Sequence, residues 1–139
     1  MNVSELLSDL TVHYNAIIRQ AASHLGLTAS QAFHLISIPH SGISMSSLSH
    51  KLGLDTSTLT RNIQKLEKMG LVERFSSSFD KRVQNTVLTQ RGGEIVKKME
   101  ELLTETSQLI MNQIDLEEQE HILTVLEKLV WSMDCIREE

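Results

Sequence analysis

The sequence predicts a mainly α-helical fold with one small β-hairpin, of the α+β class, and two observations carry this prediction. Apolar residues recur every three or four positions along most of the chain, which is the spacing of one helix face. After Gly70 the pattern changes: LVERF and VQNTVL are short, rich in β-branched residues and separated by the polar stretch SSSFDKR, as in a β-hairpin. With 139 residues, 40% of them apolar, the chain suffices for one domain.

The N-terminal part predicts two helices. The first begins at a capping residue, Ser4, and runs to about Leu25. A capping box formed by Thr28 and Gln31 starts a second, short helix around 29–38. The stretch HSGIS that follows is predicted to be a turn.

Two further short helices are predicted on either side of the tight turn LGLD. Ser44 starts the earlier one, and the later one, DTSTLTRNIQKLEKMG at 55–70, is capped by Asp55 or Thr56. Gly70 followed by an apolar residue fits a Schellman stop. Two short helices joined in this way form a helix-turn-helix, and the hairpin directly behind them makes it winged.

Two long helices complete the order. Thr89 caps a helix of about 90–112, and the last helix runs to about Ile136 with apolar residues at the 4-3-4-3 spacing of a helix-packing seam. We therefore predict three parts: an N-terminal helix (1–27), a winged helix-turn-helix (28–92) and C-terminal helices (93–139). The terminal helices carry more apolar positions than a small winged domain can cover, which allows a dimer.

The charge is unevenly distributed along the chain. The net charge is −5, yet residues 51–98 hold ten basic and five acidic side chains, which leaves 3 basic and 13 acidic residues elsewhere. A basic centre between acidic arms is the pattern of a protein that approaches a polyanion with one surface, although a solvated charged face is the ordinary alternative.

The outer face of the helix at 55–70 suits double-stranded DNA. The second helix of a helix-turn-helix fits the major groove, which is about 12 Å wide. There Arg61 can pair with guanine and Gln64 with adenine. The expected major-groove residues are Ser57, Thr58, Thr60, Arg61, Gln64 and Lys65, and the expected phosphate contacts are Ser44 and Lys68.

The hairpin tip is expected to reach the neighbouring minor groove, whose negative potential attracts arginine. Asp80 cannot contact DNA favourably, but it can hold Arg82 or Lys81 in position by a charge-assisted hydrogen bond. The expected wing contacts are Arg74, Asp80, Lys81 and Arg82.

Residues 44–93 resemble the winged-helix core of the MarR family of bacterial transcription regulators. The motifs that carry the resemblance are Leu48-Ser49, Leu52-Gly53, Ser57-Thr58-Leu59-Thr60-Arg61, the run from Leu66 to Arg74, Asp80-Lys81-Arg82 and Leu88-Thr89-Gln90-Arg91-Gly92. The flanking helices agree in length and order. The chain departs from the family pattern at Ser49, where a small apolar residue is usual, and at Phe79, where the wing tip is usually polar.

The resemblance implies a homodimer in which the first and last helices of two subunits interlock. The N-terminal helix (1–27) and the C-terminal helices (93–139) are then dimerisation helices, and each chain forms one intertwined domain with the winged helix-turn-helix (28–92). We expect Leu7, Leu10, Leu126, Leu129 and Met133 at that interface. A two-fold dimer requires a pseudo-palindromic operator with half-sites roughly 10 bp apart. The expected function is a sequence-specific regulator in the bacterial or archaeal cytoplasm, associated with the nucleoid: a repressor that a small ligand releases. The alternative is an architectural or protein-adaptor module without ligand control.

The sequence also contains residues that could form an effector site. A small-molecule pocket lined by His13, Tyr14, Ile17, Phe33 and Met45 competes with plain core packing of the same residues. Cys135 lies beside acidic residues, which disfavour a reactive thiolate, so a buried or interface thiol is expected in place of a redox sensor.

We expect no metal, no cofactor and no membrane partner. No metal site is expected because no two histidines share a helix at the spacing of metal ligands. The alternative is a zinc site formed by His24, His34 and His40 if the fold brings them together. The sequence has no Gly-rich phosphate loop and no nucleophile–base pair, which argues against an enzyme. No apolar run approaches the roughly 20 residues of a membrane span.

Overall fold

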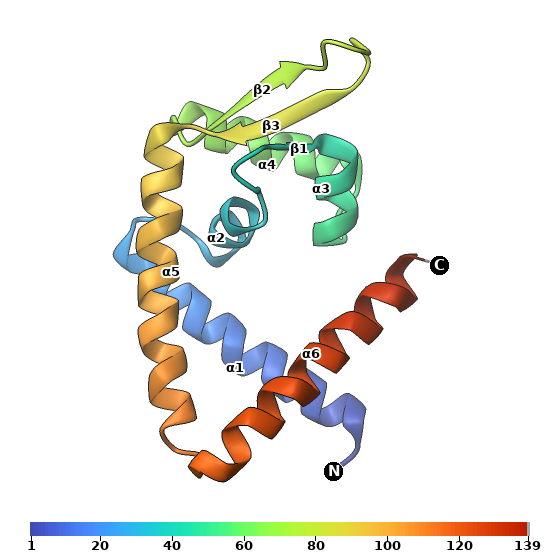
Figure 1. Cartoon of the computed structure of the whole chain (residues 1–139). Coiled ribbons are helices and arrows are strands. Elements are labelled where there is room, and N and C mark those ends of the chain that lie inside the picture. The colour runs from blue at the N-terminus through green and yellow to red at the C-terminus, as the bar shows by residue number, and fades with distance from the viewer. Residues whose placement is uncertain (139) are drawn as a thin grey trace. The chain divides into compact units, whose positions relative to one another are not determined.

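The computed structural model describes residues 1–138 of the chain (Figure 1). Its elements are, in order, α1 (Val3–His24), α2 (Ala29–Ile36), β1 (Ile43–Ser44), α3 (Met45–Leu52), α4 (Thr56–Lys68), β2 (Val72–Ser76), β3 (Gln84–Leu88), α5 (Gln90–Met111) and α6 (Leu116–Glu138). The predicted winged helix-turn-helix with flanking helices is confirmed, with one strand added. The chain divides into two compact units, Met1–Leu103 and the part from Thr104 onward.

The start of α1 corrects one prediction. Its cap is Asn2, whose side-chain Oδ1 accepts a hydrogen bond of 2.9 Å from the Glu5 N–H, while the Glu5 carboxylate accepts one of 3.1 Å from the Asn2 N–H. This reciprocal box satisfies two amides at once, so the helix begins before Ser4. The predicted capping box at the start of α2, Thr28 with Gln31, is confirmed.

Both ends of α4 follow the sequence. Asp55, not Thr56, is its cap. At the other end the Leu71 N–H donates to the Leu66 carbonyl at 3.0 Å, and Gly70 takes the left-handed conformation with φ of 75°. This is the predicted Schellman stop, and it turns the chain directly into the wing.

The wing is a three-stranded antiparallel sheet in the order β1-β3-β2. The predicted hairpin is present, with Val72 opposite Leu88, and β1 adds the pair Ile43 opposite Thr86. Strand β1 is not predicted by the sequence, because two residues are too few to show an alternating pattern. Thr86 lies in the central strand, is fully buried and donates from Oγ1 to the Met45 sulfur at 2.9 Å.

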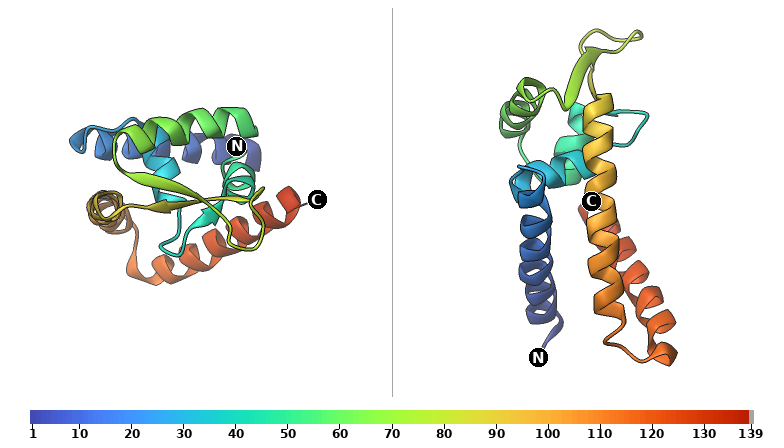
Figure 2. Two further views of the ribbon diagram at one scale, coloured as in Figure 1. Left: turned by 90° about the horizontal axis from the view of Figure 1, so that it is seen from above. Right: turned by 90° about the vertical axis from the view of Figure 1, so that its left-hand side faces the viewer.

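The core of the first unit collects one apolar face from each of several helices. The α4 residues that the helical spacing assigns to the core, Leu59, Ile63 and Leu66, are all fully buried. The other residues with at most 1% exposure are Ile18, Ala22, Ala32, Leu35, Leu48, Leu71, Thr86 and Met99. Helix α4 is therefore held by its apolar side, which leaves the opposite side at the surface (Figure 2).

The second unit contains the end of α5 and α6. The side-chain amide of Gln119 donates to the backbone carbonyls of Met111 and Ile114, both at 3.0 Å, and so fastens the connection between the two helices. No residue of α6 as described is buried. Leu109, near the end of α5, is 66% exposed within this chain.

Candidate nucleic-acid interface

The predicted recognition surface lies along α4. Ser57, Arg61, Gln64 and Lys65 are exposed, whereas Thr58 and Thr60 are half-buried. Figure 1 shows α4 and the β2–β3 hairpin side by side at one end of the first unit. The six side chains predicted for the major groove therefore all come from one short helix that stands next to the wing.

Asp55 organises the start of this helix. Its carboxylate accepts hydrogen bonds from the Ser57 hydroxyl at 2.7 Å, the Thr58 N–H at 2.8 Å and the Thr58 hydroxyl at 2.8 Å. The Ser57 hydroxyl, then the two Thr58 donors and the nearby Arg61 charge, lower the pKa of Asp55 to about 2. A carboxylate at a helix N-terminus is also favoured by the helix dipole.

This arrangement changes what the face of α4 offers to a partner. The hydroxyl protons of Ser57 and Thr58 are used by Asp55, and that of Thr60 is donated to the Thr56 carbonyl at 2.8 Å. Ser57 and Thr60 therefore present oxygen lone pairs, and the threonines their methyl groups, where the sequence alone suggests donors. The Thr58 oxygen already accepts from Arg61 Nη2 at 3.4 Å. Donation to a partner falls to Arg61, Gln64 and Lys65.

Replacing Asp55 by Asn is expected to remove a pH-dependent part of the stability. The pKa of Asp55 is lowered in the folded chain, so its ionised form stabilises the fold above about pH 4, and this contribution is lost as the pH falls toward 2. Urea unfolding of both proteins between pH 6 and pH 2 tests this. The wild type should be the more stable at pH 6, and the difference should shrink across that interval. A difference independent of pH would contradict the expected role of the charge, since Asn is itself a good cap.

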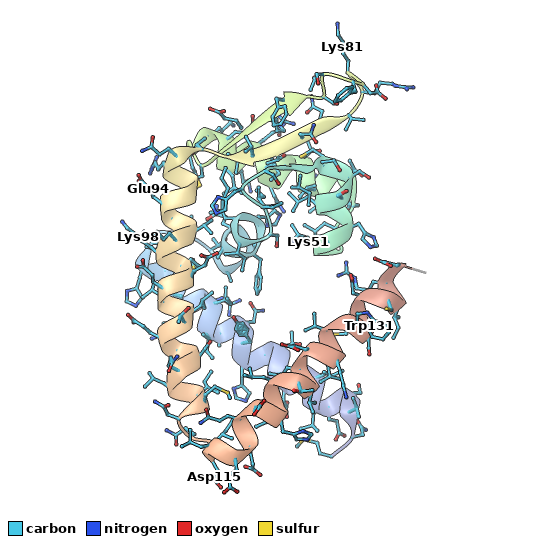
Figure 3. The ribbon with its side chains drawn as sticks, viewed as in Figure 1. Lys51, Lys81, Glu94, Lys98, Asp115 and Trp131 are labelled. Carbon is cyan, nitrogen blue, oxygen red and sulfur yellow. The ribbon has the colours of Figure 1, made fainter. Side chains whose placement is uncertain are left out.

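The wing tip holds Arg82 in a fixed orientation. Asp80 accepts from Arg82 Nε at 3.1 Å, from Arg82 Nη2 at 3.2 Å and from the Arg82 N–H at 3.0 Å. The Arg82 side chain, and next its backbone N–H, lower the pKa of Asp80. Of the two cations that Asp80 was expected to hold, the structure selects Arg82, whose side chain is still 91% exposed. Lys81 projects from the tip of the hairpin (Figure 3).

Arg74 has a partner within the protein. Its Nε donates to the Glu67 carboxylate at 2.8 Å, and both side chains are more than half covered, at 24% and 31% exposure. The pair joins β2 to α4, so it ties the wing to the helix beside it. Of the two predicted phosphate contacts, Lys68 is exposed at the last position of α4, and Ser44 caps α3 by accepting from the Ser47 N–H at 3.1 Å.

A second brace, which sequence reasoning did not identify as such, joins the start of α5 to the end of α4. The Thr89 hydroxyl donates to the Gly70 carbonyl at 2.7 Å, and Arg91 Nη1 donates to the Met69 carbonyl at 2.8 Å. Gly92 lies so close to the chain that a Cβ atom there would stand 2.0 Å from the Leu71 carbonyl oxygen. The Leu88-Thr89-Gln90-Arg91-Gly92 motif contains the residues of this brace, but the sequence does not show which carbonyl groups Thr89 and Arg91 bind.

A buried polar pair links α2 to α4. His34 is 3% exposed, its Nδ1 donates to the Ser30 carbonyl at 2.6 Å, and its Nε2 accepts from the Asn62 side-chain amide at 3.1 Å. A carbonyl can only accept, so this geometry corresponds to the neutral imidazole with the proton on Nδ1. His24 and His40 are exposed, and within residues 1–138 no group of three His, Cys, Asp or Glu side chains is placed to hold a metal ion.

The residues predicted to line an effector pocket differ in their exposure. Met45 is buried and accepts from Thr86, and Phe33 packs against the core, as the core-packing alternative has it. Ile17 is half-buried, while His13 and Tyr14 lie exposed on α1. Two shallow depressions of the described chain lie elsewhere, one along 3–12 of α1 and one beside Gln64, Glu67 and Lys68.

The terminal helices expose many apolar side chains. On α1, Leu10 is 53% exposed and Leu7 is half-buried; on α6, Leu126 and Met133 are each 41% exposed and Leu129 is half-buried. Cys135, expected to be covered, is exposed in the single chain. Among residues 1–138, no helix combines the length and the apolar character that crossing a bilayer would require.

Comparison with known proteins gives a consistent result. Residues 27–83 match the model of the MarR family. The crystal structure of wild-type MarR from E. coli in its apo form is 25% identical, with a TM-score of 0.81 over 93% of this chain and 96% of that chain. A MarR transcriptional regulator from Methanosarcina mazei Go1 is 25% identical, with a TM-score of 0.85 over 96% and 97%. The S. aureus MepR–DNA complex has the same fold, at 21% identity and a TM-score of 0.77 over 95% and 98%.

Proposed function

We propose that this chain, which belongs to the MarR family, is a dimeric, sequence-specific DNA-binding transcription repressor. The family membership and the winged helix-turn-helix are the premise. The repressor activity, the dimer, the individual DNA contacts and the release by a small ligand are the proposal.

The observation that carries the proposal is the pairing of two preorganised cationic elements in one unit. Helix α4 presents Arg61, Gln64 and Lys65 outward, and the adjacent wing presents an arginine locked by Asp80. A rigid helix face suits base edges in the major groove, and an arginine on a narrow finger suits the minor groove beside it. Two braces, Glu67–Arg74 and Thr89–Gly70, fix the spacing between the two elements.

The proposed contacts follow from this geometry. Arg61 reads guanine and Gln64 reads adenine, while Lys65, Lys68 and Ser44 approach phosphates. Ser57, Thr58 and Thr60 approach base edges as acceptors or through their methyl groups. Arg82 enters the minor groove with Lys81 beside it, and Arg74 keeps the wing in register. The solved complex of S. aureus MepR with DNA is a related fold on the same kind of partner.

A homodimer is proposed because both ends of the chain expose apolar helix faces. Leu7 and Leu10 of α1 and Leu126, Leu129 and Met133 of α6 supply the interface. Apolar faces of this extent are normally covered in solution. Release by a small apolar ligand is proposed at the predicted residues of α1 and α2, with His13 and Tyr14 accessible and Ile17 and Phe33 half-buried beneath the surface.

The experiment that tests the function is genomic footprinting with the purified protein, followed by titration of the selected duplex. We expect a pseudo-palindromic site with half-sites about 10 bp apart. Arg61→Ala should weaken binding by about 1–3 kcal/mol and relax the preference at one base step of each half-site. The matched control is Arg19→Ala, which removes the same charge from an exposed position on α1.

The outcomes separate the two candidate classes. A selective loss with Arg61→Ala, absent from Arg19→Ala, supports sequence-specific binding by α4. If Arg61→Ala and Arg82→Ala both bind the selected duplex as tightly as the wild type, the results contradict the proposal and favour the alternative function, an architectural or protein-adaptor module. Failure of the wild type to enrich any genomic site at low salt would have the same consequence.

A further inference from the structure

We propose that Phe79 at the wing tip is a minor-groove wedge, an apolar side chain that presses between two base pairs where Arg82 enters the groove. This inference rests on the proposed function, since it needs DNA beneath the wing. It assigns a DNA contact to a residue outside the cationic set.

Phe79 is 99% exposed, which means that its ring gains nothing from packing within the chain. Its backbone is nevertheless fixed. The Phe79 N–H donates to the Ser77 hydroxyl at 3.2 Å, the Ser77 N–H donates to the Val83 carbonyl at 2.8 Å, and the Val83 N–H donates to the Asp80 carbonyl at 3.0 Å. The ring therefore stands on a closed turn at the end of the hairpin.

The surroundings of Phe79 identify its partner. Single exposed apolar residues are ordinary on protein surfaces, so exposure alone would say little. Here the ring is followed by Lys81 and Arg82, and the intervening acid, Asp80, is bonded to Arg82. The tip thus combines a solvent-facing ring with outward cations. Charge of this sign fits a polyanion and does not favour an apolar protein surface.

An arginine and an apolar side chain on one finger suit a minor groove. Proteins that deform DNA from this side read it with basic residues and insert Phe, Leu, Ile or Met between base steps, which kinks the duplex. The cost of opening a step is lowest at pyrimidine–purine steps such as TA. The wedge therefore predicts a sequence preference at base pairs that α4 does not touch.

The experiment uses the duplex selected by footprinting, with the step beneath the wing written either as TA or as part of an A-tract. A 2-aminopurine at that step reports unstacking by a rise in fluorescence. Three variants are compared with the wild type: Phe79→Ser removes the wedge, Phe79→Leu keeps an apolar one, and Phe75→Ser removes the half-exposed phenylalanine of β2 as a matched control.

We expect Phe79→Ser to bind the TA duplex about tenfold more weakly, to lose the preference for TA and to abolish the fluorescence rise. Phe79→Leu should retain most of the affinity, of the TA preference and of the fluorescence rise. Phe75→Ser should bind the TA duplex within about twofold of the wild-type affinity. Equal binding by Phe79→Ser overturns the wedge, and so does a wild-type complex without the fluorescence rise. In both cases, if Arg61→Ala still weakens DNA binding, the proposed function is retained. A wild-type protein that binds neither duplex would contradict both the wedge and the proposed function.

Discussion

Gly92→Ala is expected to lower the free energy of unfolding by about 3 kcal/mol or more, because the new methyl group meets backbone and not a movable side chain. The Cβ atom would stand 2.0 Å from the Leu71 carbonyl oxygen and 3.0 Å from its carbon. That same carbonyl accepts from the Thr89 N–H at 3.0 Å, so the chain cannot retreat without losing a bond that joins α5 to the start of the wing. Urea unfolding at fixed protein concentration measures the effect.

The neighbouring glycine supplies the matched control. Gly93 also lies in the first turns of α5, and a Cβ atom there meets nothing within 4 Å. Gly93→Ala should therefore raise the stability by about 0.5–1 kcal/mol, the ordinary gain of Ala over Gly inside a helix. Similar effects at the two positions would mean that helix propensity, not the close approach at Leu71, governs both.

His34→Ala is expected to cost about 3 kcal/mol of stability. The substitution empties a buried site and leaves the Asn62 amide without its acceptor, because His34 Nε2 is the group that Asn62 contacts at 3.1 Å. The loss falls on α4, since Asn62 lies in the middle of that helix. Weaker DNA binding by this variant should accompany its lower stability.

A double-mutant cycle with His34→Leu and Asn62→Leu isolates the hydrogen bond from the packing. Each single change strands one polar partner and should cost about 1–3 kcal/mol, whereas the double change replaces both partners by apolar groups and should be close to neutral. If the two single effects simply add in the double variant, the bond between His34 and Asn62 contributes nothing to holding α4 against α2.

The helix caps and the hairpin were predictable because their causes are local. Thr28 with Gln31, Ser44, Asp55 and the Gly70 stop are interactions between residues at most five apart, so a short window of sequence contains both partners. Ser4 was the wrong cap for α1 because Asn2 and Glu5 form a complete box upstream of it. Strand β1 was missed because its two residues pair with Thr86 and Asn85, far along the chain.

Some features of the candidate site were likewise predictable from the sequence, and others required the structure. The sequence identified the face of α4 and the arginine-tipped wing, because one helical period and one charged turn define them. Only the structure shows that Asp55 accepts hydrogen bonds from the Ser57 and Thr58 hydroxyls, because the sequence does not say which acceptor each donor will find. Only the structure shows that Arg74 pairs with Glu67.

By itself, the sequence determined the order of the helices and of the β2–β3 hairpin, the side of α4 that enters the core and the exposed cations Arg61, Lys65 and Arg82. Helical periodicity and capping depend on residues only a few positions apart, so they can be predicted from the sequence. Only the tertiary structure decided how α4 is held: the ion pair from β2, the bond from His34 of α2 and the approach of Gly92 to Leu71. Each of these joins residues from different parts of the chain, which the common burial of apolar faces brings together.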